Sequence, residues 1–560
     1  MKIFLAQQNY HIGNFEANTD KIITAIRDAK GQGGDLIVFS ELAVCGYPPR
    51  DFLEFNDFVE QCLKSIDIIK EEADTIGVLV GCPSRNPKVE GKDLFNSAYF
   101  LYDKKVQAIA NKTLLPTYDI FDEYRYFEPA NEWNIIQFKG KKLAVTICED
   151  IWNMGDNPLY RICPMDALIQ QQPDIMINLS ASPFDYIHAE SRLNIVKQNV
   201  AKYNLPMIYC NTVGSQTEIV FDGGSLVMDA EQNIVKELPY FKEEMTFVEL
   251  GDDNKFTTPV ARKAEHAPYI DDISLKLNHE HNIDYIHKAL LTGIRDYFNK
   301  LGFKKAIVAS SGGVDSALVL TLAVEALGAE NVHALLMPSQ FSTGHSVDDA
   351  VQLSKNLNTT YDIIAIKDIF QSFEAALKPV FKDLPFNVAE ENLQSRIRGA
   401  LVMALSNKFG SILLNTSNKS ELSTGYGTLY GDMAGGLGVL GDLYKMQVYA
   451  LCRHINRNGE IIPHNILTKA PSAELRPDQK DSDSLPEYDV LDPILYQYIE
   501  RRQGPKEIIA QGADAALVNR ILKMVNMNEY KRNQFCPIIR VSPKAFGVGR
   551  RVPIVGKYLS

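Results

Sequence analysis

Short apolar runs of strand length alternate with segments of helical periodicity along most of the chain. In the first half the apolar runs fall at 3–7, 35–39, 77–80, 97–102, 143–148, 175–179, 207–210 and 225–228, and helical patterns fall at 18–30, 57–73 and 189–203. In the second half a helical pattern at 283–301 precedes strand–helix pairs at 306–309 and 317–327, 332–337 and 346–357, and 361–366 and 369–378. This alternation predicts a layered α/β fold, whose second half has a parallel sheet with ligands at the carboxyl ends of its strands.

Between the two halves, residues 251–281 carry glycine, threonine, proline and several charges without a clean apolar period. We predict that this stretch connects two domains, because a chain of 560 residues is too long for one hydrophobic core. It is not rich in Gly and Ser, which favours a segment packed along the surface over a free tether. The predicted division is residues 1–255, a connecting segment at 256–281, and residues 282–560.

The composition of the chain limits its partners and its location. A net charge of −12 and a pI near 5.5 argue against a nucleic-acid or anionic-membrane surface. The eight cysteines are scattered without a CxxC pair, which excludes the usual zinc spacings and is typical of reduced thiols. Neither a signal peptide nor a long uncharged apolar stretch is recognisable. We expect a cytoplasmic protein that binds neither membranes nor nucleic acid.

One Gly/Ser-rich turn stands between a strand-like run and a helical pattern. It comprises Ala309, Ser310, Ser311, Gly312, Gly313, Val314, Asp315 and Ser316. Paired glycines let the backbone approach an anion, and successive N–H groups at a helix start form an anion-binding nest. No Gly-Lys-Ser/Thr follows, so the turn is not a Walker A loop, and an aspartate beside phosphates requires a cation such as Mg²⁺. The alternative is a Gly-rich turn without a ligand in an ordinary α/β sheet.

Three polar residues stand where strands of the first half end or loops begin: Glu41, Lys112 and Cys148. A nucleophilic cysteine requires a base to take its proton and a cation to stabilise the thiolate and the oxyanion. Glutamate, lysine and cysteine supply these roles. Taken singly, each residue has another interpretation: Cys148 as a buried small hydrophobe, and the other two as solvated surface charges.

Residues 1–255 resemble the nitrilase superfamily, which carries a Glu–Lys–Cys triad on an αββα sandwich. The run 112–127 (KTLLPTYDIFDEYRYF) is similar to the form found in glutamine-dependent NAD⁺ synthetases. On that resemblance Tyr118 contacts glutamine, and Glu123 is an auxiliary glutamate that orients the lysine.

The run 178–188 (NLSASPFDYIH) resembles the glutamine pocket of the same family. The resemblance places Ser182 and His188 at glutamine-binding positions. For His188, an exposed structural histidine is the alternative.

The second half carries a second resemblance. SGGVDS resembles the pyrophosphate-binding signature of the N-type ATP pyrophosphatases, which split ATP into AMP and pyrophosphate to activate a carboxylate or carbonyl oxygen. Further stretches are similar to the synthetase domain of NAD⁺ synthetases. The resemblance implies contacts to ATP from Thr416, Lys445 and Ser472, contacts to deamido-NAD⁺ from Asn392, Arg396, Glu421 and Lys531, and Mg²⁺ ligation by Asp315 and Glu421.

Three positions of this half have a second interpretation or depart from the family. The spacing from Ser417 to Glu421 is also close to that of a capping box at a helix start. Shorter, ammonia-dependent relatives carry a lysine after Thr424 where this chain has Leu429, so that substrate contact is missing or is supplied elsewhere.

Two stretches of the second half are predicted to be mobile: 431–441, with five glycines, and 476–486, which is acidic and flanked by prolines. Closure of such loops over an adenylate would exclude water from a hydrolysable intermediate. Two ordinary surface loops are the alternative.

Taken together, the resemblances imply a two-site enzyme acting in the last step of NAD⁺ synthesis. At the first site the Cys148 thiolate attacks L-glutamine, with Glu41 as base and Lys112 on the oxyanion. At the second site the carboxylate of deamido-NAD⁺ attacks ATP, and ammonia then displaces AMP. Ammonium is not nucleophilic, so a sheltered passage for ammonia is expected. The family also implies a homo-oligomer, either a dimer through the synthetase domain or a higher assembly.

Three other classes of protein share part of these features. Amidotransferases that make GMP, asparagine or argininosuccinate have the same ATP-splitting loop, but they pair it with different or no glutaminase domains. A tRNA-thiolating enzyme would show paired catalytic cysteines and a basic surface, and neither is present. A nucleotide sensor derived from a decayed synthetase is disfavoured by the intact triad and SGGVDS turn.

Overall fold

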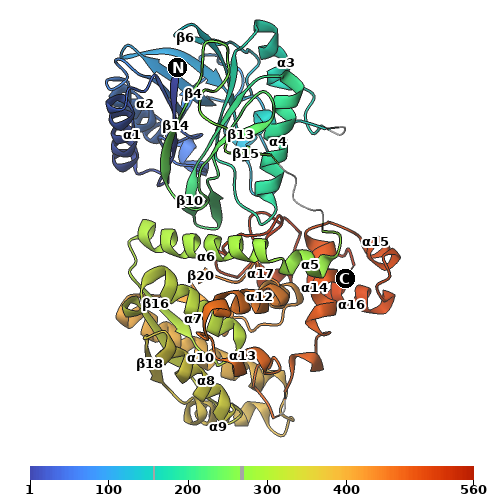
Figure 1. Cartoon of the computed structure of the whole chain (residues 1–560). Helices are drawn as coiled ribbons and strands as arrows, with labels where there is room; N and C mark the ends of the chain where they lie inside the picture. The colour runs from blue at the N-terminus through green and yellow to red at the C-terminus, as the bar shows by residue number, and fades with distance from the viewer. Residues whose placement is uncertain (156–157, 265–269, 478, 560) are drawn as a thin grey trace. The chain divides into compact units, whose positions relative to one another are not determined.

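The computed structural model describes residues 1–155, 158–264, 270–477 and 479–559 (Figure 1). The chain divides into two compact units, Met1–Pro268 and Tyr269–Ser560, and each is described by itself. Part of the predicted connecting segment, 265–269, lies outside the described residues. Its described parts hold the short strand β15 (Arg262–Lys263) and the helix α5 (Ile273–Asn278).

Two large sheets form the centre of the first unit. The first sheet has the order β14 (Glu244–Glu249), β1 (Lys2–Gln7), β2 (Leu36–Val38), β3 (Gly77–Arg85), β4 (Leu94–Tyr102) and β5 (Lys105–Asn111). The second has the order β15, β13 (Asn233–Glu237), β12 (Leu226–Met228), β9 (Met207–Asn211), β8 (Ile175–Ser180), β7 (Lys141–Ile147) and β6 (Ile136–Phe138). A separate hairpin joins β10 (Val213–Gln216) to β11 (Ile219–Asp222).

Helices cover the outer face of each sheet, which gives an αββα sandwich (Figure 1). The helices α1 (Phe15–Gly31) and α2 (Asn56–Lys70) pack on the first sheet, and α3 (Pro164–Leu168) and α4 (His188–Tyr203) pack on the second. In β1, Phe4 and Ala6 face the helices, whereas Ile3 and Leu5 join the core between the sheets. Both faces of such strands are buried, which is why the sequence shows continuous apolar runs there.

The second unit is built on one parallel sheet with the order β18 (Thr360–Ile363), β17 (Val332–Leu336), β16 (Lys305–Ala309), β19 (Ser411–Asn415) and β20 (Leu437–Gly438). Its helices are α5, α6 (Glu280–Leu301), α7 (Val314–Leu327), α8 (Gly344–Asn356), α9 (Lys367–Phe381), α10 (Val388–Phe409), α11 (Lys419–Thr424), α12 (Lys445–Ile455), α13 (His464–Thr468), α14 (Tyr488–Ile499), α15 (Pro505–Ala510), α16 (Ala515–Met527) and α17 (Glu529–Arg532). Strand order reverses between β16 and β19, so the carboxyl ends of these two strands flank a crevice of the kind that binds ligands in doubly wound sheets.

The predicted fold class is confirmed in both units: an αββα sandwich and a parallel α/β sheet. One prediction about the second unit is wrong. The stretch 431–441 was expected to be mobile, yet Leu437, Val439 and Leu440 are fully buried, and β20 pairs with β19. The other predicted mobile stretch, 476–486, includes residue 478, which lies outside the described residues. In the described ranges, none of the helices combines the length and apolar character that crossing a bilayer requires.

Candidate active sites

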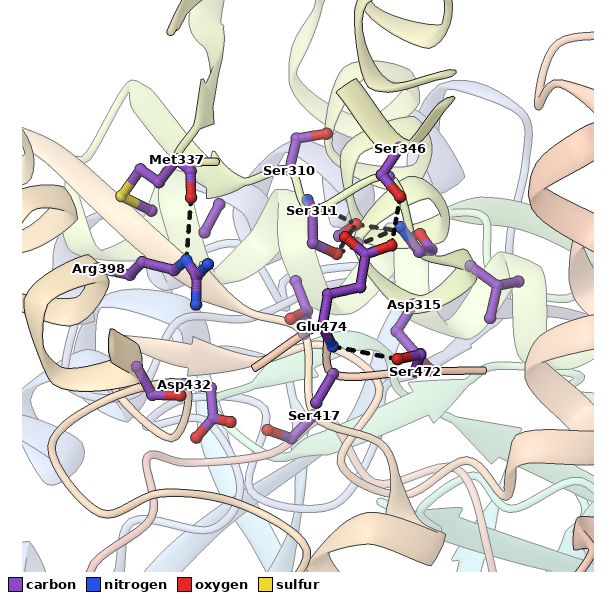
Figure 2. Close-up of a pocket in the computed structure, with 18 of the residues that line it drawn as sticks. Ser310, Ser311, Asp315, Met337, Ser346, Arg398, Ser417, Asp432, Ser472 and Glu474 are labelled. Atoms are coloured by element: carbon purple, nitrogen blue, oxygen red, sulfur yellow. Dashed lines mark hydrogen bonds between the residues drawn. The ribbon is translucent and has the colours of Figure 1, made fainter. Parts of the chain in front are cut away.

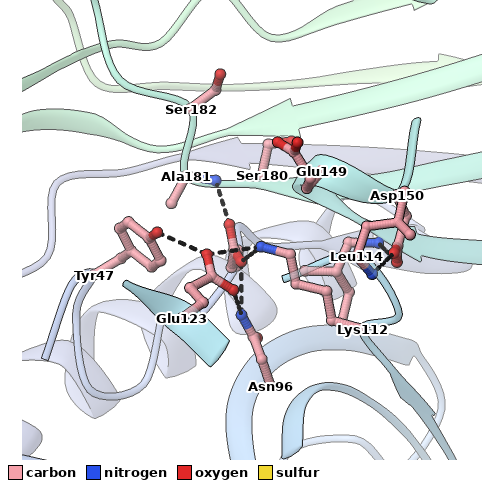
Figure 3. A network of polar contacts seen from close by, with 12 residues as sticks. Tyr47, Asn96, Lys112, Leu114, Glu123, Glu149, Asp150, Ser180, Ala181 and Ser182 are labelled. Carbon is pink, nitrogen blue, oxygen red and sulfur yellow. Dashed lines mark hydrogen bonds and ion pairs between the residues drawn. The ribbon is translucent and has the colours of Figure 1, made fainter. Parts of the chain in front are cut away.

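The first site has Lys112 at its centre, held between two buried carboxylates (Figure 3). The Lys112 Nζ donates to Glu41 Oε1 at 2.7 Å and to Glu123 Oε1 at 2.8 Å. All three side chains are at most 6% exposed, so solvent screens these ion pairs little. Burial lowers the pKa of Lys112, but the two carboxylates outweigh that effect and the net shift is well upward. The lysine is therefore a permanent cation in this site.

Strand ends bring these residues together. Glu41 follows β2 and Lys112 follows β5 in the first sheet, whereas Cys148 follows β7 in the second sheet, so the site draws on both layers of the sandwich. Gly81 of β3 makes room for the Glu41 segment: a Cβ there would lie 2.2 Å from Leu42 N and 2.5 Å from Ser40 O. No other residue fits such a close backbone approach.

Cys148 begins a single 3₁₀ turn, Cys148–Ile151, and its backbone has a φ of +42°. A left-handed backbone conformation is rare for a residue other than glycine, and it persists only where the surrounding structure holds it. Burial and the charge of Glu41 raise the pKa of the Cys148 thiol, and Lys112 opposes the rise. The thiol is consequently protonated at rest and requires a base to become a nucleophile.

Three residues of this site were not predicted from the sequence. Asn96 donates to Glu41 Oε1 at 2.7 Å, and the Tyr47 hydroxyl donates to Glu123 Oε1 at 2.7 Å. Asp150 accepts N–H donors from Thr113, Leu114 and Ile147, which ties the segment after Lys112 to the strand end before Cys148. In the sequence, the one feature that could have pointed to these three residues is that they are polar and lie beside apolar runs.

The predicted glutamine contact Tyr118 bonds Glu149, the residue that follows Cys148. The Tyr118 hydroxyl donates to both oxygens of Glu149, at 3.0 and 3.1 Å, and the Tyr160 hydroxyl donates to Glu149 Oε1 at 3.1 Å. Burial raises the pKa of Glu149 to about 7, and Lys112 and the two tyrosines limit that rise. Glu149 and Tyr160 were missed by the sequence analysis.

Ser182 and His188 form the second predicted part of this pocket. The Ser182 Oγ and His188 Nε2 atoms lie 2.6 Å apart, and the His188 ring stacks on Trp152 with centroids 5.1 Å apart. The imidazole is 16% exposed and is held in place by these neighbours, an arrangement that a glutamine contact and a structural histidine share.

The second site is a cavity of about 270 Å³ at the switch point of the parallel sheet (Figure 2). All eight residues of the Gly/Ser-rich turn at 309–316 line it, together with Thr416, Glu421, Lys445 and Ser472. Gly312 has a φ of +79°, and a Cβ there would lie 2.1 Å from Ser346 O, so only glycine fits. Helix α7 begins at Val314, so its free N–H groups and dipole point toward the turn.

The charges of this cavity are paired with one another. The Lys445 Nζ donates to Asp315 Oδ2 at 2.5 Å and lies 3.3 Å from Glu421 Oε1. Burial and the neighbouring Asp315 raise the pKa of Glu421 to about 8, with Lys445 opposing. The capping box at the start of α11 is formed by Asn418 and Glu421, one residue later than the Ser417 position that the sequence predicted. Asn418 also donates to Asp315 Oδ1 at 2.9 Å, so one residue both caps the helix and contacts the cavity.

The donor set of Asp315 and Glu421 fits Mg²⁺. In the described ranges no cluster of three or more His, Cys, Asp or Glu side chains has metal-binding geometry. Mg²⁺ typically binds to one or two carboxylates and completes its shell with substrate phosphates and water. Asp315 and Glu421 are partly buried carboxylates beside an anion-binding turn, and they provide such a partial shell.

Ser472 lies on a loop held across the cavity (Figure 2). Its Oγ accepts from the N–H of Glu474 at 3.1 Å, and Glu474 in turn bonds Ser346 Oγ at 2.6 Å and Lys469 Nζ at 2.8 Å. Arg398 lines the same cavity and donates to Met337 O at 3.0 Å, and burial lowers its pKa to about 10. These contacts were not predicted.

The three remaining predicted substrate contacts gather around residues 425–429, outside the residues that line the cavity. The Lys531 Nζ donates to the carbonyls of Gly425 and Gly427 at 2.7 and 2.9 Å. Arg396 Nε donates to the carbonyl of Leu429 at 3.2 Å. Asn392 Oδ1 accepts from Thr428 Oγ1 at 2.7 Å. At the position where shorter relatives carry a lysine, Leu429 thus offers its backbone carbonyl to Arg396.

A Glu–Lys–Cys centre on an αββα sandwich and a glycine-rich anion turn on a parallel sheet define a two-domain amide-transferring ligase. The family model described as carbon-nitrogen hydrolase matches residues 2–253. The family model described as NAD synthase matches residues 286–535.

Individual relatives are similar over the full length. The chain is 44% identical to a glutamine-dependent NAD(+) synthetase of Synechocystis sp., over 99% of this chain and 98% of that protein. It is 40% identical to the Thermotoga maritima protein of the same name, over 100% of this chain and 99% of that protein. The solved structure of glutamine-dependent NAD+ synthetase from Acinetobacter baumannii with adenosine diphosphate superposes with a TM-score of 0.76 at 38% identity, covering 99% and 98%. The chain belongs to the glutamine-dependent NAD⁺ synthetases, which are C–N ligases.

Proposed function

We propose that the first unit hydrolyses L-glutamine and that the second uses the ammonia and ATP to convert deamido-NAD⁺ into NAD⁺. The observation that carries this proposal is the Lys112 ammonium held between Glu41 and Glu123 beside a buried thiol, in a chain of this family. We assign the two activities to residues 1–255 and 282–560. The products are NAD⁺, glutamate, AMP and pyrophosphate.

At the first site Glu41 takes the proton of the Cys148 thiol, and the thiolate attacks the amide carbon of glutamine. The Lys112 ammonium stabilises the oxyanion of the tetrahedral intermediate without reorganisation, because the two carboxylates already fix its position. Ammonia leaves with the proton that Glu41 took, and water then releases glutamate from the thioester. Glu123 stays on Lys112 as its orienting partner.

We assign the recognition of glutamine to the polar side chains around Cys148. The buried Glu149 carboxylate pairs with the α-ammonium of the substrate, and Tyr118 and Tyr160 hold that carboxylate in place. Ser182 and His188 supply polar contacts at the other side of the substrate. The Glu149 carboxylate must be ionised for this contact.

At the second site the carboxylate of deamido-NAD⁺ attacks the α-phosphorus of ATP, and pyrophosphate departs. The N–H groups of the SGGVDS turn and the start of α7 receive the phosphates, with Thr416 and Ser472 adding hydroxyl groups. Lys445 neutralises phosphate charge after exchanging its carboxylate partners for the nucleotide. Ammonia then attacks the adenylate carbonyl, and AMP leaves.

Asp315 and Glu421 would hold Mg²⁺ on the nucleotide. When bound, the ion supplies positive charge that offsets the charge of the phosphate oxygens. Asn392, Arg396 and Lys531 bind deamido-NAD⁺ around the 425–429 loop, where they now bond backbone carbonyls and Thr428.

We propose a homo-oligomer for the second unit and a cytoplasmic location. Helix α9 buries only Phe370, whereas Phe373 is 45% exposed and Val380 is 73% exposed, one heptad apart on one face. The apolar side chains of Leu384 and Val388 are also exposed, and such patches mark protein interfaces. All eight cysteines are free thiols, as expected in a reducing compartment.

The experiment that tests this function measures NAD⁺ formation from deamido-NAD⁺, ATP and Mg²⁺. Wild type and the Cys148→Ala variant each receive glutamine or ammonium chloride as nitrogen source. We expect wild type to use both sources and the variant to use ammonium alone. A wild-type chain that makes no NAD⁺ from either source would refute the synthetase function.

A further inference from the structure

Asn96 contacts both carboxylates that hold Lys112 and the backbone of Lys112 itself, although nothing in the proposed mechanism uses it. It lies in β4 and is fully buried. Its Nδ2 donates to Glu41 Oε1 at 2.7 Å and reaches Glu123 Oε2 at 3.4 Å (Figure 3). Its backbone carbonyl accepts from the N–H of Lys112 at 2.8 Å. The residue thus joins the base, the auxiliary glutamate and the lysine.

The other uncharged donors of the site each contact one carboxylate. The Tyr47 hydroxyl donates to Glu123 Oε1 at 2.7 Å, and the Ala181 N–H donates to Glu41 Oε2 at 3.0 Å. Besides the charged Lys112, Asn96 is the side chain that donates to both acids among the contacts of the described residues. A neutral donor in this position lowers the repulsion between the two acids without adding a charge.

The charge balance explains why a bridging donor is needed. Two buried carboxylates share the single ammonium of Lys112, so the ionised centre carries an excess negative charge beside the thiol. Like charges so close together favour uptake of a proton by one of them, unless hydrogen bonds stabilise the ionised forms. If Glu41 took up that proton, it could no longer accept the proton of Cys148.

We propose that Asn96 is a positioning residue for glutamine hydrolysis, which fixes Glu41 and Glu123 around Lys112 and keeps Glu41 available as the base. This inference rests on the proposed glutaminase function of the first site. The ionisable groups that face the amide are Glu41, from the segment after β2, Glu123, from its 3₁₀ turn, and Lys112, after β5. Tyr47 and Cys148 complete the set through their interactions with the two acids.

The test compares Asn96→Ala and Asn96→Asp with Ser97→Ala. Ser97 is the next residue of the same strand, is also fully buried, and bonds Ser84 and Asn111 and no carboxylate. Glutamate release by the full chain is followed as kcat and KM from pH 5.5 to 9, and ammonium-dependent NAD⁺ formation reports the amount of active chain. Thermal unfolding is recorded for each variant.

We expect Asn96→Ala to lower kcat for glutamate release about 10- to 100-fold, the effect of losing a hydrogen bond to a charged group, with KM changed by less than about threefold. The Asn96→Asp variant should be least active at high pH and recover as the pH falls, because a protonated aspartic acid can donate where the amide did. Ser97→Ala should keep the kcat of wild type.

Two results overturn the inference. In the first, the kcat of Asn96→Ala lies within twofold of Ser97→Ala. In the second, Asn96→Asp and Asn96→Ala show the same pH profile, which would mean that the donor is irrelevant and only strand packing matters. Failure of the proposed function looks different: a wild-type chain that releases no glutamate overturns both proposals at once.

Discussion

The two sites differ in what satisfies their charges before any substrate binds. In the first site, Lys112, Glu41 and Glu123 are buried and already paired with one another in the arrangement on which the proposed reaction depends. In the second site, Lys445 pairs with Asp315, and around the 425–429 loop outside the cavity Arg396 and Lys531 bond backbone carbonyls. The first site therefore keeps its ion pairs during the proposed reaction, whereas the cations of the second unit must exchange their present partners for substrate groups.

This difference follows from the size and charge of the substrates. Glutamine is small, and its transition state develops one negative charge, which a fixed ammonium stabilises without reorganisation. ATP and deamido-NAD⁺ bring several phosphate charges, so the cations that bind them need temporary partners while the site is free. Substitutions of Lys112, Glu41 or Glu123 should therefore act on kcat, whereas those among the nucleotide-binding residues should act on substrate or metal requirements.

The largest effect is expected for Lys112→Met. Glutamate release should fall at least about 10³-fold, because the oxyanion loses its cation. The first unit should also lose about 3–5 kcal/mol of stability, because two buried carboxylates are left without their shared partner. Ammonium-dependent NAD⁺ formation should persist, and glutamate assays together with thermal unfolding measure both results.

The matched control for this variant is Lys105→Met, which removes an exposed lysine at the start of β5. It should leave both activities unchanged. Retained glutaminase activity in Lys112→Met would show that the first site is not preorganised around this lysine.

A smaller effect, about 10²-fold, is expected for Asp315→Asn. NAD⁺ formation should fall equally with glutamine and with ammonium, and the Mg²⁺ concentration for half-maximal rate should rise, because one carboxylate ligand is lost. Glutamate release should be unaffected. Asp348→Asn, an exposed aspartate of α8, serves as control. An unchanged Mg²⁺ titration would contradict the metal assignment.

Arg396→Gln should raise KM for deamido-NAD⁺ about tenfold, the effect of one lost charge-assisted contact, with little change in kcat. Arg396 is exposed on α10 and now donates to the Leu429 carbonyl, so the variant should fold normally. Steady-state kinetics with ammonium as nitrogen source measure this without the first site. Lys408→Gln, near the end of the same helix, is the control, and an equal KM in both variants would remove Arg396 from the substrate site.

Site residues that follow a clear apolar strand were easier to predict from the sequence than site residues inside a strand. Glu41, Cys148 and the SGGVDS turn each end such a run, and resemblance then supplied their chemistry. Asn96 was missed because an amide interrupts an apolar run, so the strand was predicted to begin at 97, whereas β4 begins at Leu94. The amide is tolerated there because two carboxylates from distant segments accept its hydrogen bonds.

Edge strands and glycine-rich stretches were also difficult to predict, for physical reasons. The strands β5 and β14 lie at the edges of the first sheet and are largely exposed, so their sequences carry no continuous apolar run. The five glycines of 431–441 suggested mobility, but a Cβ at any of them would lie within 3.0 Å of a neighbouring residue. Local composition could not show that these glycines serve close packing.

The smallest predicted effect concerns the pH dependence of stability at Glu149. Burial raises the pKa of this carboxyl to about 7 from a model-compound value of 4.5. A raised pKa means that the folded chain binds the proton more tightly than the unfolded chain does. The contribution of Glu149 to stability is therefore fully present below pH 4.5 and is lost as the pH rises to about 7.

Glu149→Gln removes this titration, so the thermal midpoint of the variant should rise relative to that of wild type between pH 5 and pH 8. Each kcal/mol of difference in unfolding free energy shifts the midpoint by about 2–4 °C. The same variant should show a raised KM for glutamine above pH 7, because the carboxylate that pairs with the substrate is gone. Glu132→Gln, which changes an exposed loop residue, should show neither trend. A thermal midpoint of Glu149→Gln that falls relative to wild type over this range would mean that binding partners keep Glu149 ionised in the folded chain. The first site would then hold three fixed carboxylates around one lysine, and its charge balance would depend still more on neutral donors such as Asn96.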